Sequence, residues 1–280
     1  MCEFCLKHGE GQKWYLQAKN YSEDLLSDVR RRKMIENFAK GDSPAESIEK
    51  LEKLSQAPRF IQALVRRLIP RKMKKWHYGQ VLPIEDVEKI FGFVNSIARV
   101  ACYCRRFTVG KEKRYCYGIS MGPNGGKFGE LMRGIDASFV NGADSAGAEM
   151  ITKEQAIAHF REHEKEGLCH TVWTFQTPFI GGICNCDRAD CLAMRCTVTH
   201  GIPVMFRAEF IAQADADKCV GCRQCMRLCQ FGAISYSASN KKAVIDKMKC
   251  FGCGVCRCVC TKNAITLKSR ESDAATAKIW

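Results

Sequence analysis

Eight cysteines near the end of this sequence form two copies of one spacing pattern. The copies are Cys219-x2-Cys222-x2-Cys225-x3-Cys229 and Cys250-x2-Cys253-x2-Cys256-x3-Cys260. The flanks repeat as well, because Gly221 matches Gly252 and Asp215 matches Asp246, each pair 31 positions apart. Eight thiols in duplicated register constrain the fold strongly, since they require two equivalent loops that each gather cysteine side chains around one point.

This spacing is the one with which bacterial-type sequences hold [4Fe–4S] clusters. Three cysteines of one copy converge on one cluster, and the fourth reaches across to the other cluster. The pattern therefore predicts two clusters with crossed ligands. The first would use Cys219, Cys222, Cys225 and Cys260, and the second would use Cys250, Cys253, Cys256 and Cys229.

Residues 211–270 resemble the 2[4Fe–4S] ferredoxin domain of bacterial type, with short strands expected at 233–236 and 264–267. That family has proline after each fourth cysteine, whereas Gln230 and Thr261 stand there in this chain. We expect ligation to survive this departure. Cys258 is a surplus thiol in the second copy, which we interpret as a buried free cysteine, with an alternative ligand as the competing interpretation.

The composition indicates a folded protein with a hydrophobic core, and its many cysteines indicate metal binding. The chain has 280 residues, of which 46% are hydrophobic and 19 are cysteines, so it accommodates one large or two modest domains. The sequence opens without the basic and apolar run of a signal peptide, and no stretch approaches the roughly 20 apolar residues that span a bilayer. These features predict a cytoplasmic protein rather than a secreted one with disulfides.

The formal net charge of +14 indicates a basic surface. Much of it comes from residues 30–33 and 66–75. Such a surface favours an acidic redox protein or a larger oxidoreductase complex as the partner, through electrostatic steering. Nucleic acid is the alternative, but the sequence contains no motif for binding it.

Hydrophobic periodicity predicts an α+β architecture. Helices are expected over 21–40, 44–69 and 84–97, with Pro58 breaking the second and Pro70 ending it. We expect a strand end at 99–102 and a loop at 122–129. Thr152 and Gln155 form a capping box that opens a helix ending at Gly167, and 170–175 alternate like a strand. The expected regions are 1–78 (helical, with a Cys-rich head), 79–210 (a Cys-rich α+β domain) and 211–280 (a 2[4Fe–4S] ferredoxin domain).

Ten further cysteines precede Cys219 and indicate more metal chemistry. Two groups stand at predicted strand ends, with Cys102, Cys104 and Cys116 in one and Cys184, Cys186 and Cys191 in the other. Because loops at strand ends converge, we expect these groups to form a third metal centre. An iron–sulfur cluster is favoured over a zinc site of four thiolates, and buried free thiols are the third interpretation. Cys2 and Cys5 form a CxxC pair that needs further ligands to bind a metal.

The chain from about residue 79 is also similar to a family of uncharacterised bacterial and archaeal iron–sulfur proteins. In these, a Cys-x-Cys-Arg segment and an Ile-Cys-Asn-Cys segment precede a ferredoxin tail. The matching segments here are 81–84, 101–105, 167–170 and 183–186. The resemblance implies an electron-transfer context and names no substrate.

Three functions compete on this sequence. The first is an iron–sulfur electron-transfer protein or subunit that connects redox partners. The second is a reductase whose N-terminal cluster has an open coordination position for a small molecule. The third is a structural or regulatory iron–sulfur module. The sequence has neither a Gly-x-Gly-x-x-Gly fingerprint nor a P-loop, so a nucleotide or flavin would come from a partner.

Overall fold

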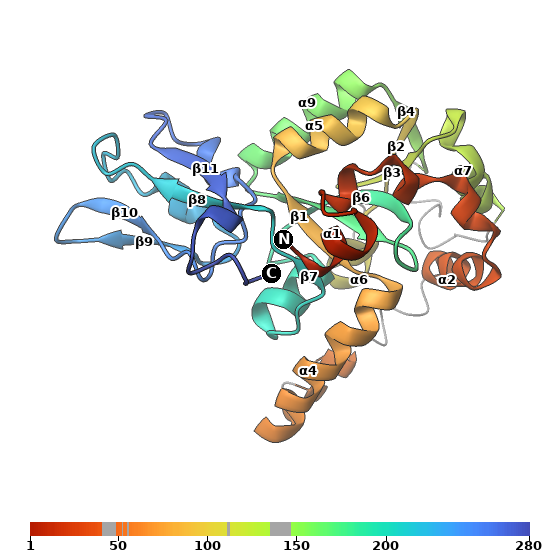
Figure 1. Cartoon of the computed structure of the whole chain (residues 1–280), viewed down its shortest axis with the longest axis horizontal. Coiled ribbons are helices and arrows are strands. Elements are labelled where there is room, and N and C mark those ends of the chain that lie inside the picture. Colours follow the sequence, from red (N-terminus) through yellow and green to blue (C-terminus); the bar gives the residue numbers. More distant parts are fainter. Residues whose placement is uncertain (41–48, 52, 55, 111–112, 135–146) are drawn as a thin grey trace.

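A computed structural model of the chain describes residues 1–40, 49–51, 53–54, 56–110, 113–134 and 147–280. These residues form a larger lobe built on a seven-stranded sheet and a smaller tail with two strand pairs. In Figure 1 the tail extends to one side of the sheet lobe, and the two chain ends lie close together between lobe and tail. The separate helices and mainly antiparallel strands confirm the expected α+β class.

The central sheet has the strand order β4-β2-β3-β6-β5-β1-β7. In that order the strands are Glu149–Ile151, Ser96–Val100, Cys116–Ser120, Ile180–Cys186, Cys169–Thr174, Gly79–Leu82 and Met205–Phe206. Neighbours are antiparallel except β1 and β7. Because side chains alternate along a strand, Cys184 and Cys186 pack on one face of β6 and Ile183 packs on the other.

The two faces of the sheet are covered differently. One face packs against α5 (Ile84–Phe93), α9 (Lys153–Lys165) and the N-terminal head, which comprises α1 (Glu3–His8), η1 (Trp14–Leu16) and η2 (Ala18–Tyr21). The other face meets α6 (Tyr103–Val109), α10 (Leu192–Met194) and the π-helical turn η5 (Arg195–Thr199). This second face carries the cysteines of the sheet lobe other than Cys2 and Cys5 of the head.

The N-terminal helices differ in detail from the predicted ones. The helix expected over 21–40 is divided into η3 (Glu23–Ser27) and α2 (Val29–Lys40). The Asp28 carboxylate accepts a hydrogen bond from the Arg30 backbone N–H at 2.8 Å, which starts a new helix there. The helix end expected at Gly41 lies outside the described residues.

Helix α4 (Arg59–Trp76) confirms the break at Pro58 but contradicts the end expected at Pro70, which lies inside the helix. A proline removes only one backbone N–H, and the helix-forming residues that follow it continue to Trp76. The first part of the predicted 44–69 helix, at 44–48, lies outside the described residues.

Two further expectations are corrected and two are confirmed. The helix expected over 84–97 ends at Phe93, because Ser96–Val100 pairs with β3 and β4 as β2. The loop expected at 122–129 contains η4 (Pro123–Gly125) and the start of α7 (Gly126–Arg133). The capping box at Thr152 is confirmed and opens α9, and the strand expected at 170–175 is β5.

The tail begins with β8 (Phe210–Ala214), which pairs with β11 (Ile265–Ser269), while β9 (Ile234–Ser237) pairs with β10 (Lys242–Ile245). The strands expected after each cysteine group are therefore present as β9 and β11. Between the strands lie α11 (Gln224–Leu228) and η6 (Val255–Arg257), and η7 (Arg270–Ser272) follows. None of the helices in the described part of the chain is both long and apolar enough to cross a bilayer.

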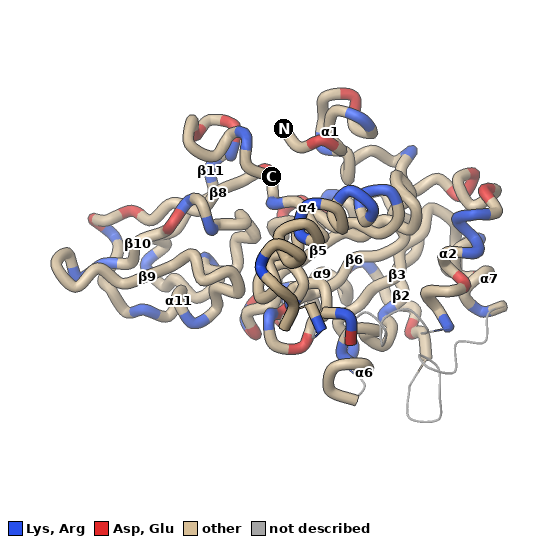
Figure 2. Tube along the Cα trace, turned by 90° about the horizontal axis from the view of Figure 1, so that it is seen from below, with Lys and Arg blue, Asp and Glu red and all other residues tan. Residues whose placement is uncertain are grey.

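The predicted basic surface is smaller than the sequence indicates. Arg31 is buried, and its guanidinium donates to the backbone carbonyls of Phe175 and Gln176. Lys74 donates to the Glu3 carboxylate at 2.6 Å. Arg71 and Lys72 remain exposed on α4, and Figure 2 shows the basic residues along this helix.

Candidate metal centres

The structure brings together the four cysteines predicted to hold the first cluster. A small cavity in the tail is lined by Cys219, Cys222, Cys225 and Cys260. Burial is the main cause that raises the pKa of the Cys225 thiol. The nearby Cys222 and Cys219 act in the same direction, and so does Cys260 from the other copy. Cys222 is exposed, so this cavity lies at the solvent side of the tail.

The four cysteines predicted to hold the second cluster also lie together. Burial is the main cause that raises the pKa values of Cys253 and Cys256, and both thiols also feel Cys250 and Cys229. Cys250 and Cys256 are buried. The fourth cysteine of each copy therefore lies with the three cysteines of the other copy.

The two copies also share a pattern of backbone donors to sulfur. The N–H of Ala243 donates to the Cys219 sulfur and that of Ala212 to the Cys250 sulfur, both at 3.4 Å. The N–H groups of Ala233 and Ala264 donate to the sulfurs of Cys229 and Cys260, at 3.2 and 3.3 Å. Such donors stabilise a thiolate and tune the potential of a cluster. The duplicated spacing thus folds into two equivalent environments.

Six cysteines of the sheet lobe gather on the second face of the sheet. We call them the six-thiol group: Cys102, Cys104, Cys116, Cys184, Cys186 and Cys191. Cys116 and Cys184 are register partners on β3 and β6, whereas Cys102 and Cys191 precede α6 and α10. The two groups that lie far apart in the sequence therefore meet in space.

Interactions between neighbouring thiols connect the six-thiol group. Cys116 interacts with both Cys102 and Cys184. Cys191 interacts in the same way with Cys104 and Cys186. The group therefore consists of two neighbouring triplets, with Cys116 and Cys191 at their centres.

The environment keeps these thiols protonated in the absence of metal. The neighbouring Cys116 thiol, together with burial, raises the pKa of Cys102 well above its usual range. For Cys184, the neighbouring Cys116 thiol acts to lower the pKa, but burial together with Cys186, Cys102 and Cys104 outweighs it, and the pKa rises to about 12. Metal ions bind the thiolate form, so their binding here would release protons.

A buried arginine lies beside the six-thiol group. The Arg105 guanidinium forms an ion pair with Asp187 and donates to the Cys102 sulfur at 3.4 Å and to the Asn185 carbonyl at 3.1 Å. Burial acts to lower the pKa of Arg105, but Cys102 and Asp187 outweigh burial and raise it. This ion pair places a fixed positive charge next to the thiols.

A cavity of about 740 Å³ opens beside the six-thiol group. All six thiols and Cys196 contribute to its wall. Its other walls are largely apolar and include Phe128, Met132, Trp173 and Phe175. The cavity is large enough for a small molecule, and it adjoins the thiols directly.

Cys169 connects the tail with the six-thiol group. It is fully buried on β5, where its register partner is Cys186. Burial raises its pKa, and Cys253 of the tail and Cys191 act in the same direction. One hydrophobic cluster contains Cys169, Cys186 and Cys191 together with Cys229 and Cys253. The cysteines predicted to hold the second tail cluster and the six-thiol group are therefore neighbours within one packed core.

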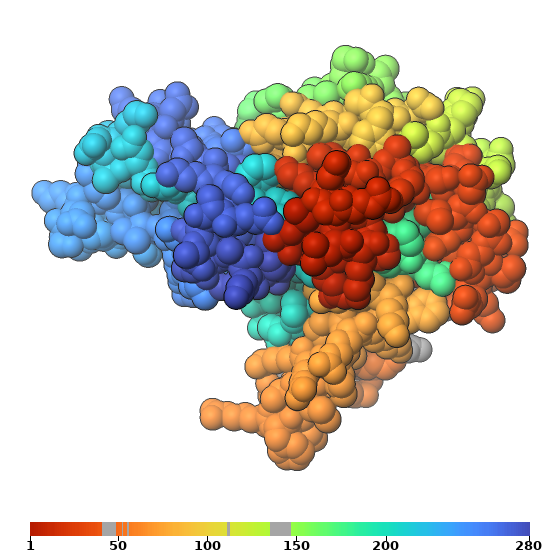
Figure 3. Space-filling model, in the orientation of Figure 1, coloured from red at the N-terminus to blue at the C-terminus, as the bar shows by residue number. Residues whose placement is uncertain are grey.

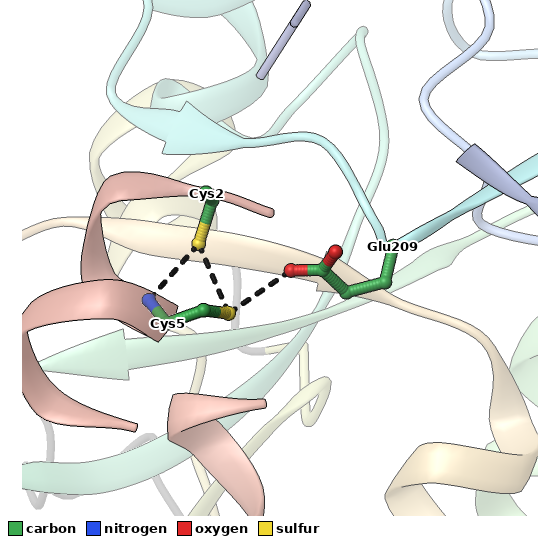
Figure 4. Close-up of side chains that lie close together, drawn as sticks. All are labelled: Cys2, Cys5 and Glu209. Carbon is green, nitrogen blue, oxygen red and sulfur yellow. Dashed lines mark hydrogen bonds between the residues drawn. The ribbon is translucent and has the colours of Figure 1, made fainter. Parts of the chain in front are cut away.

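The CxxC pair at Cys2 and Cys5 lies elsewhere, in the N-terminal head. Figure 4 shows both sulfurs close to the carboxylate of Glu209. The three ligand atoms all lie within 4.8 Å of one another, and all three residues are buried.

Sequence reasoning missed two of these residues and misplaced a third. Glu209 carries no local signal, because it lies 204 positions from Cys5. The alternation of β5 could have marked Cys169 as sharing the face of the other cysteines. Cys258, expected to be buried, is exposed, and its thiol donates to the Glu164 carbonyl at 3.2 Å.

The tail of the chain is similar to a known protein family. Residues 218–264 match the family model of the 4Fe-4S dicluster domain. A search of curated proteins found no match, and neither did a search of solved structures. The matched residues contain all eight cysteines of the duplicated pattern, so the tail of this chain is a ferredoxin-type 4Fe–4S domain.

Proposed function

We propose that this chain transfers electrons through two [4Fe–4S] clusters in the tail to a third iron–sulfur centre in the sheet lobe. The first cluster is held by Cys219, Cys222, Cys225 and Cys260, and the second by Cys250, Cys253, Cys256 and Cys229. The six-thiol group holds the third centre. The main support for this proposal is the position of Cys169, which pairs with Cys186 of the six-thiol group in the sheet and packs in one hydrophobic cluster with Cys253 of the tail.

The spread of the six thiols favours a cluster over a single zinc ion. A tetrahedral zinc site with Zn–S bonds of about 2.3 Å places its sulfurs about 3.8 Å apart. Among the described residues, Cys2, Cys5 and Glu209 have their ligand atoms all within 4.8 Å of one another, whereas no three of the six thiols do. The six thiols are more numerous and more widely spaced than one zinc ion needs, so they suit a centre with several irons. Arg105 would offset the negative charge of such a cluster and its thiolates.

The burial of the sites suggests the direction of the relay. Cys222 at the first cluster is exposed, and Val220 beside it is 61% exposed. The second cluster and the six-thiol group are more deeply buried. Electrons would therefore enter at the first cluster, from an acidic redox protein or a larger oxidoreductase complex. Exposed Arg227 and Lys262 near that cluster, with Arg71 and Lys72 on α4, supply the basic surface for such a partner.

Stopped-flow reduction tests the relay. We expect a low-potential protein donor to reduce all three centres of the wild-type chain, with EPR of freeze-quenched samples identifying each. In Cys253→Ala, which removes a ligand of the second cluster, the first cluster should still be reduced while the third centre is reduced at least tenfold more slowly. Cys258→Ala is the matched control and should behave as wild type. Equal rates at the third centre in both variants would contradict the relay.

The cavity beside the six-thiol group favours a second candidate function, a reductase acting on a small apolar molecule. The cavity of about 740 Å³ reaches the thiols themselves, so a molecule bound there would contact the third centre. If one iron of that centre lacks a cysteine ligand, cyanide should shift its EPR signal. An unchanged signal would favour the relay without substrate turnover.

A further inference from the structure

The N-terminal head meets the start of the tail at a buried group of metal-ligating side chains. We call Cys2, Cys5 and Glu209 the head site. The sulfurs of Cys2 and Cys5 are 3.3 Å apart, and the Cys5 sulfur is 3.0 Å from a carboxylate oxygen of Glu209. Figure 4 shows the three side chains pointing toward one another. The site joins two cysteines at the start of the chain to a glutamate that lies just before the tail.

A fourth possible ligand atom, an oxygen, faces the head site. The side-chain oxygen of Gln80 lies 3.6 Å from the Cys2 sulfur. Its orientation is fixed, because Trp14 donates to the same oxygen and the Gln80 amide donates to the Arg207 carbonyl at 3.1 Å. An amide oxygen has two lone pairs, so it can accept from Trp14 and still face a ligand.

The carboxylate of Glu209 is buried beside the two thiols. Glu209 is 7% exposed, and both cysteines are 0% exposed. Within the described ranges, no lysine or arginine forms an ion pair with its carboxylate. The nearby Arg270 feels the charge of Glu209, which acts to raise the arginine's pKa, but its guanidinium donates to the backbone carbonyls of Ala208 and Phe210 rather than to the carboxylate. A buried carboxylate without a cation is costly unless it is paired or coordinates a metal.

A disulfide between Cys2 and Cys5 explains this arrangement less well than a metal ion. Oxidation would remove the Cys5 thiol proton, which is the donor to Glu209, and would leave the carboxylate without a hydrogen bond. Zinc–sulfur bonds of about 2.3 Å and zinc–oxygen bonds of about 2.0 Å require sulfur–sulfur and sulfur–oxygen separations of about 3.8 and 3.5 Å. The observed 3.3, 3.0 and 3.6 Å differ from these by about 0.5 Å or less.

We propose that Cys2, Cys5 and Glu209 bind one zinc ion, with the side-chain oxygen of Gln80 in the fourth position. Two thiolates and one carboxylate form a soft and compact donor set of the kind that zinc accepts. All four positions are filled by protein, which indicates a structural site. The ion would attach the head to Glu209, immediately before β8 leads into the tail. Figure 3 shows the head packed against the C-terminal segment at this junction.

Zinc analysis of the full chain tests this site independently of the proposed electron relay. We expect one zinc per chain after anaerobic purification with zinc supplied. X-ray absorption at the zinc edge should show two sulfurs at about 2.3 Å and two oxygens at about 2.0 Å. Cys2→Ser combined with Cys5→Ser should lose the zinc while keeping the iron of the tail, which serves as the check on folding. Cys258→Ser is the matched control and should keep the zinc.

A second variant separates loss of a ligand from loss of the fold. Glu209→Gln keeps the shape of the side chain and should weaken zinc binding at least tenfold. Zinc content unchanged in the cysteine double variant would overturn the proposal, and so would a shell of four sulfurs, which would place the ion in the six-thiol group. A Cys2–Cys5 disulfide found by mass spectrometry in the anaerobic protein would also overturn it. A mononuclear ferrous signal lost in the double variant would overturn the choice of zinc while assigning the same residues to iron.

Discussion

Gly252 should tolerate alanine much less well than Gly232, although both glycines have left-handed backbones. Their φ angles are +73° and +61°. A Cβ at Gly252 would lie 2.0 Å from the Phe210 carbonyl oxygen, whereas a Cβ at Gly232 would meet nothing within 4 Å. Gly232→Ala is therefore a matched control that has the backbone strain without the clash.

The structure gives the size of the difference. A left-handed non-glycine residue costs roughly 1–2 kcal/mol, and both variants carry that cost. Relieving the clash at Gly252 requires the Phe210 carbonyl to move by about 1 Å, since Cβ contacts under 3.0 Å are essentially never observed. That movement disrupts the 2.9 Å hydrogen bond from the Arg270 guanidinium to this carbonyl, a charged hydrogen bond worth about 1.5–3 kcal/mol. Gly252→Ala should thus cost about 2.5–5 kcal/mol.

Anaerobic urea unfolding followed by circular dichroism measures both costs, and EPR reports on the clusters. We expect the second cluster to be lost or weakened in Gly252→Ala, because this loop carries Cys250 and Cys253, while the first cluster persists. Gly232→Ala should keep both clusters. Equal costs for the two substitutions, within about 0.5 kcal/mol, would refute the argument from the close approach to Phe210.

Three further predictions follow from the same geometry. Cys229→Ser should damage the second cluster and Cys260→Ser the first, as judged by EPR of each reduced variant; damage to the cluster of the same copy would rule out crossed ligation. Burial lowers the pKa of His163 to about 4, whereas the unfolded chain titrates near 6.5, so the unfolded state binds more protons between these values. The free energy of unfolding should therefore fall by up to about 3 kcal/mol as the pH decreases from 6.5 to 4. Urea unfolding at several pH values should show a smaller dependence on pH in His163→Asn than in the wild type. The same dependence on pH in both proteins would contradict this role of His163. Arg71→Gln with Lys72→Gln should slow association with an acidic redox partner at low salt, and the difference from wild type should vanish well above about 0.1 M salt, where charges are screened beyond about 10 Å; a difference that persists at high salt would exclude steering.

The sequence predicted the parts of the molecule that depend on local spacing. The duplicated cysteine pattern anticipates the match to the dicluster domain, because ligand spacing is a local property of each loop. The structure brings the two outlying cysteine groups together because Cys116 and Cys184 are register partners on adjacent strands. Whether they hold a cluster stays a prediction, as do the ligand assignments in the tail.

The remaining features depend on tertiary contacts that no local pattern encodes. Pro70 lies within α4 because the surrounding turns outweigh one missing hydrogen bond. Arg31 lies in a basic run yet is buried, since backbone carbonyls from residues 144 and 145 positions away accept its N–H groups. Glu209 joins Cys2 and Cys5 only after the chain has folded. Single polar residues that act through distant partners are invisible to periodicity.

The central claim is that the six-thiol group holds a third iron–sulfur centre. The most direct test is the iron and acid-labile sulfide content of the anaerobically purified full chain and of Cys116→Ser combined with Cys191→Ser, which removes the central thiol of each triplet. We expect about twelve irons in the wild type, if the third centre is also a [4Fe–4S] cluster, and about eight in the variant, with the tail clusters retained. About eight irons in both proteins would contradict it.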